Sequence, residues 1–228
     1  EKPQQGTHAS LFCARPGLVV WKASAWAESK DYYNPKEVME AARLMLSVAD
    51  KYKGNNNFEY DLVDVLRQAI AEKGRLTLKI VSSAFKAEDK DIFEQASKRF
   101  LNLILLQDEL LGTRKEFRVG NWTNMARNIG NTLEEKNLYE WNARVQITTW
   151  GNHSASERGK LHDYAHKEWN GILKDFYYMR WKTYFDGLTR SLKGEMVPVI
   201  DWYAVEEPWT KVSDTYSSQP EGNCIEVA

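Results

Sequence analysis

Three of the four histidines in the chain fall between Thr148 and Trp169. His162 and His166 are four residues apart, a spacing that places two imidazoles on one face of a helix, and Asp163 adds a carboxylate. A zinc site needs further strong ligands, and a catalytic one also needs a general base such as the Glu of a His-Glu-x-x-His helix. Asp and Tyr follow His162 instead, and no cysteine or histidine cluster elsewhere supplies ligands. We therefore predict no metal site, and a metal-dependent α-helical hydrolase is an alternative that rests on these three residues alone.

The dipeptide Trp150-Gly151 opens a polar loop within the same stretch. Glycine permits a sharp turn after a large flat ring. A tryptophan at the mouth of a loop can stack on the apolar face of a sugar, because its ring has an apolar body and a polar edge. A buried tryptophan that anchors the loop would give the same pattern, so these residues alone support both interpretations equally.

A second polar cluster lies on the otherwise apolar segment from Phe58 to Phe85. Asp61 and Asp64 share a helix face, and Asp64 and Arg67 are three residues apart, which suits an ion pair. Charged side chains need partners when they are buried, so we predict an internal structural network. A catalytic pair of carboxylates is the alternative, and it would require a cleft and one carboxyl with a raised pKa.

The elements that must position these residues are predicted to be helices. Asn34-Pro35 has the pattern of an N-cap followed by proline at the first helical position. Apolar residues recur at helical spacing in the segments 35–49, 58–85, 88–111, 122–129, 133–145, 160–192 and from 198 to the turn at 217–220. Residues 145–149 alternate and also fit a strand. We predict an all-α fold: six or seven antiparallel helices in a bundle-like array over 34–228, preceded by an extended arm over 1–33, in a single domain.

The composition excludes several classes of protein. The 31 basic and 32 acidic side chains nearly cancel, so the basic excess typical of nucleic-acid binding is absent. No apolar run reaches the roughly 20 residues that a membrane span needs. The chain starts at Glu1 without a signal peptide, which indicates a segment of a longer protein. Cys13 and Cys224 lie near opposite ends, and both a disulfide and two free buried thiols fit the sequence.

Six segments carry a resemblance to a known family. In chain order they are Phe58–Gln68 (FEYDLVDVLRQ), Gly120–Trp122 (GNW), Asn142–Gly151 (NARVQITTWG), Leu161–Lys167 (LHDYAHK), Phe176–Trp181 (FYYMRW) and Ser218–Gly222 (SQPEG). Together they resemble the C-terminal helical region of α-N-acetylglucosaminidases, glycoside hydrolase family 89. The similarity extends over nearly the whole chain.

This resemblance implies a larger multidomain parent, an exo-acting, retaining glycosidase that removes terminal α-linked N-acetylglucosamine from glycans. The parent would be extracytoplasmic: periplasmic, cell-surface or secreted in a bacterium, lysosomal in an animal. Its catalytic glutamates would lie on a TIM-type barrel upstream, so we assign no catalytic residue and no cofactor to this chain. By resemblance, the domain packs on that barrel and helps to wall the sugar pocket, with Trp150, Gly151, Asp163 and Tyr164 as substrate-binding residues.

The resemblance also assigns a supporting part to Arg144, which is expected to brace the loop through charge-assisted hydrogen bonds. The chain departs from the family pattern in a longer, serine-rich segment between Gly151 and Leu161 and in the histidines at 162 and 166. An altered loop would change where Trp150 lies and tune the preference for the leaving group. Nine Trp, eleven Tyr and eight Phe leave one alternative open, a free-standing carbohydrate-binding or protein-interaction helical module.

Overall fold

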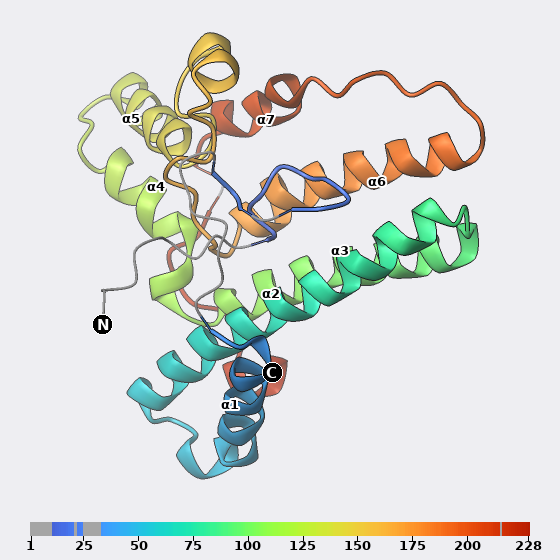
Figure 1. The fold of residues 1–228 in the computed structure, drawn as a ribbon. Helices are drawn as coiled ribbons and strands as arrows, with labels where there is room; N and C mark the ends of the chain where they lie inside the picture. Colours follow the sequence, from blue (N-terminus) through green and yellow to red (C-terminus); the bar gives the residue numbers. More distant parts are fainter. Residues whose placement is uncertain (1–10, 21, 25–32, 215) are drawn as a thin grey trace, which may run out of the picture.

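The computed structural model describes residues 11–20, 22–24, 33–214 and 216–228, which form an array of helices (Figure 1). Its α-helices are α1 (Pro35–Ser47), α2 (Asn56–Lys86), α3 (Lys90–Gly112), α4 (Val119–Arg127), α5 (Leu133–Gln146), α6 (Tyr178–Leu192), α7 (Trp202–Lys211) and α8 (Cys224–Val227). Within these ranges no strand forms, and one isolated bridge pairs Arg118 with Asn170. The predicted all-α class is confirmed.

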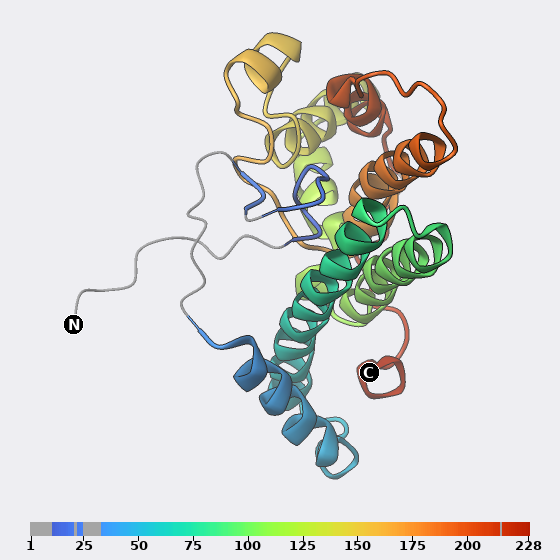
Figure 2. The same cartoon turned by 45° about the vertical axis from the view of Figure 1, so that its right-hand side comes forward.

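The antiparallel pair of α2 and α3 forms the long axis of the array (Figures 1 and 2). Each helix begins at a local cap: the side chain of Asn55 accepts a hydrogen bond from the amide of Phe58, and that of Asp89 accepts one from Ile92. Helix α1 packs against α2, and α6 packs against α3. None of the helices in the described ranges is long and apolar enough to cross a membrane.

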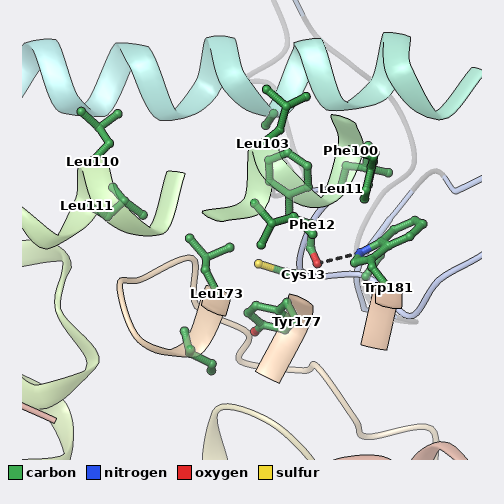
Figure 3. Packing of buried hydrophobic residues seen from close by; sticks show 14 of the residues in the cluster. Leu11, Phe12, Cys13, Phe100, Leu103, Leu110, Leu111, Leu173, Tyr177 and Trp181 are labelled. Atoms are coloured by element: carbon green, nitrogen blue, oxygen red, sulfur yellow. Dashed lines mark hydrogen bonds between the residues drawn. The ribbon is translucent and has the colours of Figure 1, made fainter. Parts of the chain in front are cut away.

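The hydrophobic core includes a short segment that comes from far away in the sequence. Leu11, Phe12, Cys13 and Ala14 are buried, and Figure 3 shows Phe12 and Cys13 between α3 and the segment that leads into α6. The indole Nε1 of Trp181 donates a hydrogen bond to the carbonyl of Phe12 at 3.1 Å. These residues form a turn inside the core and not the extended, draped arm that we predicted for 1–33; residues 1–10, 21 and 25–32 of that arm lie outside the described ranges. Cys13 and Cys224 are both buried, and they are not joined by the disulfide that the sequence left open.

The helix predicted over 160–192 begins only at residue 172. Residues 160–171 form turns and irregular backbone, and a π-helical turn over Leu173–Tyr177 leads into α6. The carboxylate of Asp108 on α3 accepts hydrogen bonds from the amides of Gly171 (2.7 Å) and Lys174 (3.1 Å). This cap starts the helix, because it satisfies amides that have no partner within the helix.

Other boundaries also differ from the prediction. Helix α5 continues to Gln146, so the alternating residues after Arg144 do not form a strand. Helix α7 starts at Trp202 rather than near Pro198, because the side chain of Asp201 accepts a hydrogen bond from the amide of Ala204.

The end of the chain packs back onto α4. A Cβ added to Gly120 would lie 2.2 Å from the carbonyl oxygen of Ser217, so only glycine permits this approach. The guanidinium of Arg118 donates hydrogen bonds to Glu221 (3.0 Å) and to the carbonyl of Gly112 (2.8 Å). Two of the motif segments, around 120 and 220, are therefore in contact.

Candidate functional site

The histidine-rich stretch leaves the end of α5 and returns to it as a closed loop. The amide of Asp163 donates a hydrogen bond to the carbonyl of Thr148 at 2.8 Å, and the amide of Trp150 donates one to Val145 at 2.7 Å. These bonds close the ends of an Ω-loop over 148–163, which we call the site loop. One π-helical turn, Ser154–Arg158, forms its tip. The site loop therefore has fixed ends although little of it is regular.

The backbone of the site loop is strained at three positions. Trp150 (φ 63°), Lys160 (φ 53°) and Asp163 (φ 59°) all adopt the left-handed conformation. Non-glycine residues in such conformations cost about 1 to 3 kcal/mol each and persist only where their surroundings enforce them. The sharp turn that we attributed to Gly151 is made by Trp150 itself. Strain of this kind makes the loop a candidate functional region.

Trp150 and Tyr164 form an aromatic pair at the neck of the site loop. Their ring centroids are 4.9 Å apart at an interplanar angle of 61°, an edge-to-face contact. Trp150 is 37% exposed and Tyr164 is 51% exposed. By contrast, Trp181 in the core is fully buried. The exposed ring fits the interpretation of Trp150 as a binding surface better than that of a buried anchor.

Asp163 directly precedes Tyr164 in the sequence, and it is fully buried. Both of its carboxylate oxygens accept hydrogen bonds from the guanidinium of Arg180, at 3.0 and 3.1 Å. Arg180 is also fully buried and donates to the carbonyl of Cys13 at 3.0 Å. The expected part of Asp163 in substrate binding stays a prediction, and this geometry favours an indirect one, in which Asp163 holds the neck of the loop.

A chain of alternating charges continues from Asp163 through the domain. Glu206 of α7 lies 2.8 Å from Arg180, and it accepts two hydrogen bonds from Arg15, both at 2.9 Å. Arg15 donates two more to Glu157 at the loop tip, at 2.6 and 2.8 Å. These hydrogen bonds lower the pKa of the Glu157 carboxyl. We call Asp163, Arg180, Glu206, Arg15 and Glu157 the charge chain.

Sequence reasoning missed Arg15, Glu157 and Glu206. Arg15 is separated from Glu157 by 142 positions and from Glu206 by 191. No local spacing rule links residues that far apart, because helical ion pairs are recognised only at separations of three or four. The buried position of the segment before Arg15 would have been the only clue, and it is itself a tertiary feature.

The histidines do not form the arrangement that their spacing suggested. His162 lies in a turn and His166 in irregular backbone, both outside any helix. The Nδ1 atom of His162 is 3.0 Å from the carbonyl of Ser156, and that of His166 is 2.9 Å from the carbonyl of Asp163. Over the part of the chain that the structure describes, no group of three or more His, Cys, Asp or Glu residues could hold a metal ion. His162 and His166 do not share a helix face, which was the arrangement that the alternative of a metal-dependent hydrolase assumed.

Arg144 forms charge-assisted hydrogen bonds within α5 and to α7, while its expected part in bracing the loop stays a prediction. Its fully buried guanidinium donates to Glu140 at 2.6 and 2.9 Å and to the carbonyl of Trp209 at 3.2 Å. It also lies over the ring of Trp209, 4.7 Å from the centroid. Its link to the site loop runs through the backbone, since Thr148 Oγ1 donates to the carbonyl of Arg144 at 2.7 Å.

The acidic cluster on α2 lies apart from the site loop. Asp64 and Arg67 form an ion pair at 2.5 Å, and the guanidinium of Arg67 lies over the ring of Phe117. Asp61 is exposed. The cluster is thus a partly exposed ion pair rather than the internal three-residue network that we predicted. Figure 1 places the start of α2 at the opposite end of the array from the site loop beside α5 and α7.

Known proteins match this chain along its whole length. The family model of the alpha-N-acetylglucosaminidase (NAGLU) C-terminal domain matches residues 1–228. The human alpha-N-acetylglucosaminidase is 28% identical over 231 residues, which cover 98% of this chain and 29% of the human protein.

Solved structures agree with this match. A family 89 glycoside hydrolase from Clostridium perfringens, in complex with PUGNAc, has a TM-score of 0.93 and 34% identity over 98% of this chain. A variant of that enzyme, in complex with its substrate GlcNAc-alpha-1,4-galactose, gives the same TM-score and identity. The chain covers 26% of that enzyme, so it spans little more than a quarter of the length of its relatives. The chain belongs to the family of alpha-N-acetylglucosaminidase C-terminal domains.

Proposed function

We propose that this chain is the accessory helical domain of an exo-acting, retaining alpha-N-acetylglucosaminidase, and that its site loop forms one wall of the sugar pocket. The observation that carries the proposal is the exposed Trp150–Tyr164 pair on a closed and strained loop. The family membership and the sugar ligand of the bacterial relative support it. The domain packs on a catalytic barrel of the same parent chain, in an extracytoplasmic compartment.

The division of labour follows from the chemistry of glycoside hydrolysis. Retaining enzymes use two carboxyl groups, one as general acid and one as nucleophile, and in a TIM-type barrel they lie at the ends of strands. In this proposal the domain positions the sugar and takes no part in proton transfer. The Trp150 ring covers apolar C–H groups of the terminal sugar, and Tyr164 supports its edge. Because the loop is already held in place, less conformational entropy is lost when the sugar binds.

The test is Trp150→Ala in the full-length enzyme, assayed with an aryl α-N-acetylglucosaminide. We expect KM to rise about tenfold, which corresponds to about 1.4 kcal/mol of binding free energy, while kcat changes less. Loss of a contact made equally in the ground and transition states has this effect. Trp141→Ala is the matched control, since Trp141 is 43% exposed on α5 and outside the loop. Wild-type kinetics in the Trp150 variant would remove this residue from the pocket.

The exposed aromatic pair also favours a second candidate, a carbohydrate-binding module that acts without a catalytic barrel. Titration of the isolated chain with N-acetylglucosamine separates the two functions. Saturable binding at millimolar concentration or below would favour the module. Lack of binding by the isolated chain, together with activity in the full-length enzyme, favours the accessory domain.

A further inference from the structure

We propose that Glu157 and Arg15 form a clamp that positions the Trp150–Tyr164 pair, so that Glu157 is a positioning residue for sugar binding. This inference rests on the proposed function, because it assigns a residue to the same pocket wall. It goes further in naming what holds that wall in place, which no local feature of the loop's sequence indicates.

The geometry of the clamp is that of an orienting ion pair. Two nitrogens of the Arg15 guanidinium contact the two carboxylate oxygens of Glu157, at 2.6 and 2.8 Å. The side chains are 14% and 28% exposed, so solvent screens the pair only in part. Two parallel hydrogen bonds fix direction as well as distance. By comparison, exposed ion pairs with a single contact contribute little to stability. Glu157 is further oriented by Ser156 Oγ, which donates to it at 3.0 Å.

The inner half of the clamp is anchored in the core. Arg15 follows Phe12 and Cys13, which are fully buried. Its guanidinium is also bound by Glu206, whose carboxylate reaches Arg180 and through it Asp163. The site loop is therefore held at its tip and at its neck, and both attachments meet at the single carboxylate of Glu206.

The tip has few other attachments. Its remaining hydrogen bonds lie within the site loop, such as Ser156 N to the carbonyl of Asn152 and Gly159 N to that of Ser154. Among the residues that the structure describes, hydrogen bonds from the tip (152–160) to residues outside the loop run through Glu157. The rings of His153 and Tyr203 also meet edge to face, with centroids 5.2 Å apart, but this contact contains no ion pair. Removal of the Glu157 charge therefore frees the tip more than any other single change there.

A freed loop weakens binding by a predictable amount. The apparent dissociation constant equals the intrinsic one divided by the fraction of molecules with a competent loop. If that fraction falls to about one fifth, KM rises about fivefold. The reacting carboxyl groups of the proposed enzyme lie on another domain, so kcat should stay within about twofold.

The first variant is Glu157→Gln in the full-length enzyme, assayed with an aryl α-N-acetylglucosaminide. Glutamine keeps the size of the side chain, and Arg15 keeps Glu206 as its partner, so the fold should persist with an unchanged melting temperature. We expect the fivefold rise in KM, and Glu157→Asp should restore part of it because the charge returns. The control is Glu195→Gln, which breaks an ion pair of similar length (2.7 Å to Arg190) remote from the loop and should leave both constants unchanged.

A double-mutant cycle shows whether Glu157 acts through Trp150. In a Trp150→Ala background, Glu157→Gln should change KM by less than about 1.5-fold, because coupled residues are not additive. Additive effects would overturn the clamp. A wild-type KM in Glu157→Gln, together with a raised KM in Trp150→Ala, would also overturn the clamp. This result would leave the proposed pocket wall intact. Wild-type kinetics in Trp150→Ala would instead remove the proposed wall, and the clamp with it.

Discussion

The α2–α3 hairpin and the site loop are stabilised in opposite ways. Each hairpin helix is capped by a side chain three residues away, such as Asn55 on Phe58, and buries a periodic apolar face. The site loop is held by side chains from remote parts of the chain: Arg15 binds its tip, and Arg180 binds its neck. Local contacts suffice where the backbone is regular, whereas an irregular loop needs partners that only the complete fold supplies.

Backbone strain follows the same division. In the hairpin, the left-handed non-glycine residue is Glu88, which lies in the turn between the helices. In the site loop, left-handed residues include Trp150 and Asp163, which flank or carry the proposed binding surface. The difference indicates that the loop's shape is imposed by its surroundings. Mutations in the two regions should therefore act differently on stability and on loop order.

The largest expected effect comes from the helical region. Phe100→Ala removes a fully buried ring of α3 that contacts Trp181 (centroids 4.4 Å apart) and Phe12 (5.4 Å). Large-to-small changes of a buried phenylalanine cost about 3 to 5 kcal/mol of unfolding free energy. Chemical denaturation should show this loss with a single transition. A loss below about 1 kcal/mol would mean that the core collapses around the cavity.

The charge chain should respond next. Arg180→Met leaves the buried carboxylate of Asp163 without its cation, while Glu206 keeps Arg15. Breaking a buried pair from one side costs about 3 kcal/mol or more. We also expect faster proteolysis within the site loop at concentrations of denaturant that leave the helices intact. Lys182→Met on the same helix breaks an exposed pair with Asp186 and should change neither measurement. Equal protection of the loop in wild type and Arg180→Met would argue against the charge chain as its support.

The smallest expected effect is a pH dependence at the junction of the two regions. Burial raises the pKa of Asp108 to about 6, although the hydrogen bonds that its carboxylate accepts from the amides of Gly171 and Lys174 lower the pKa. The folded state therefore binds a proton more tightly than the unfolded state, and this group's contribution to stability increases as pH falls through 6. Between pH 7 and 5 the gain is about 1 kcal/mol. Asp108→Asn should abolish it, measured as the difference between the two proteins' unfolding free energies at each pH. If the stability of the variant depended on pH in the same way as that of the wild type, the pKa of Asp108 would not be raised.

Predictions from the sequence were accurate for the regular helices and less accurate for the irregular region around the site loop. Periodicity located the helices over 35–49, 58–85, 88–111 and 133–145 to within a few residues, because caps and apolar spacing are local. It extended the last long helix back to residue 160, since no local signal shows that Asp108, 63 positions before Gly171, starts that helix.

The resemblance assigned residues to the candidate site, and their part in substrate binding stays a prediction; the geometry of the site could not be predicted from the sequence. The aromatic pair and Asp163 came from the resemblance, and Arg144 forms charge-assisted hydrogen bonds with Glu140 of its own helix. The left-handed conformation of Trp150 and the clamp by Arg15 depend on contacts across the fold. The assumption that residues 160–171 are helical also placed His162 and His166 on a common face that does not exist.

The buried segment around Phe12 has a consequence for the synthesis of the protein. Phe12 and Cys13 accept hydrogen bonds from Trp181 and Arg180, which follow them by 169 and 167 positions. Until a ribosome has made α6, the carbonyls of Phe12 and Cys13 lack the donors of these hydrogen bonds. Contacts of such long range form slowly because much chain entropy is lost when they close. We therefore expect the core to close only after α6 has been made, so that a chain released before α6 would remain open and prone to aggregation.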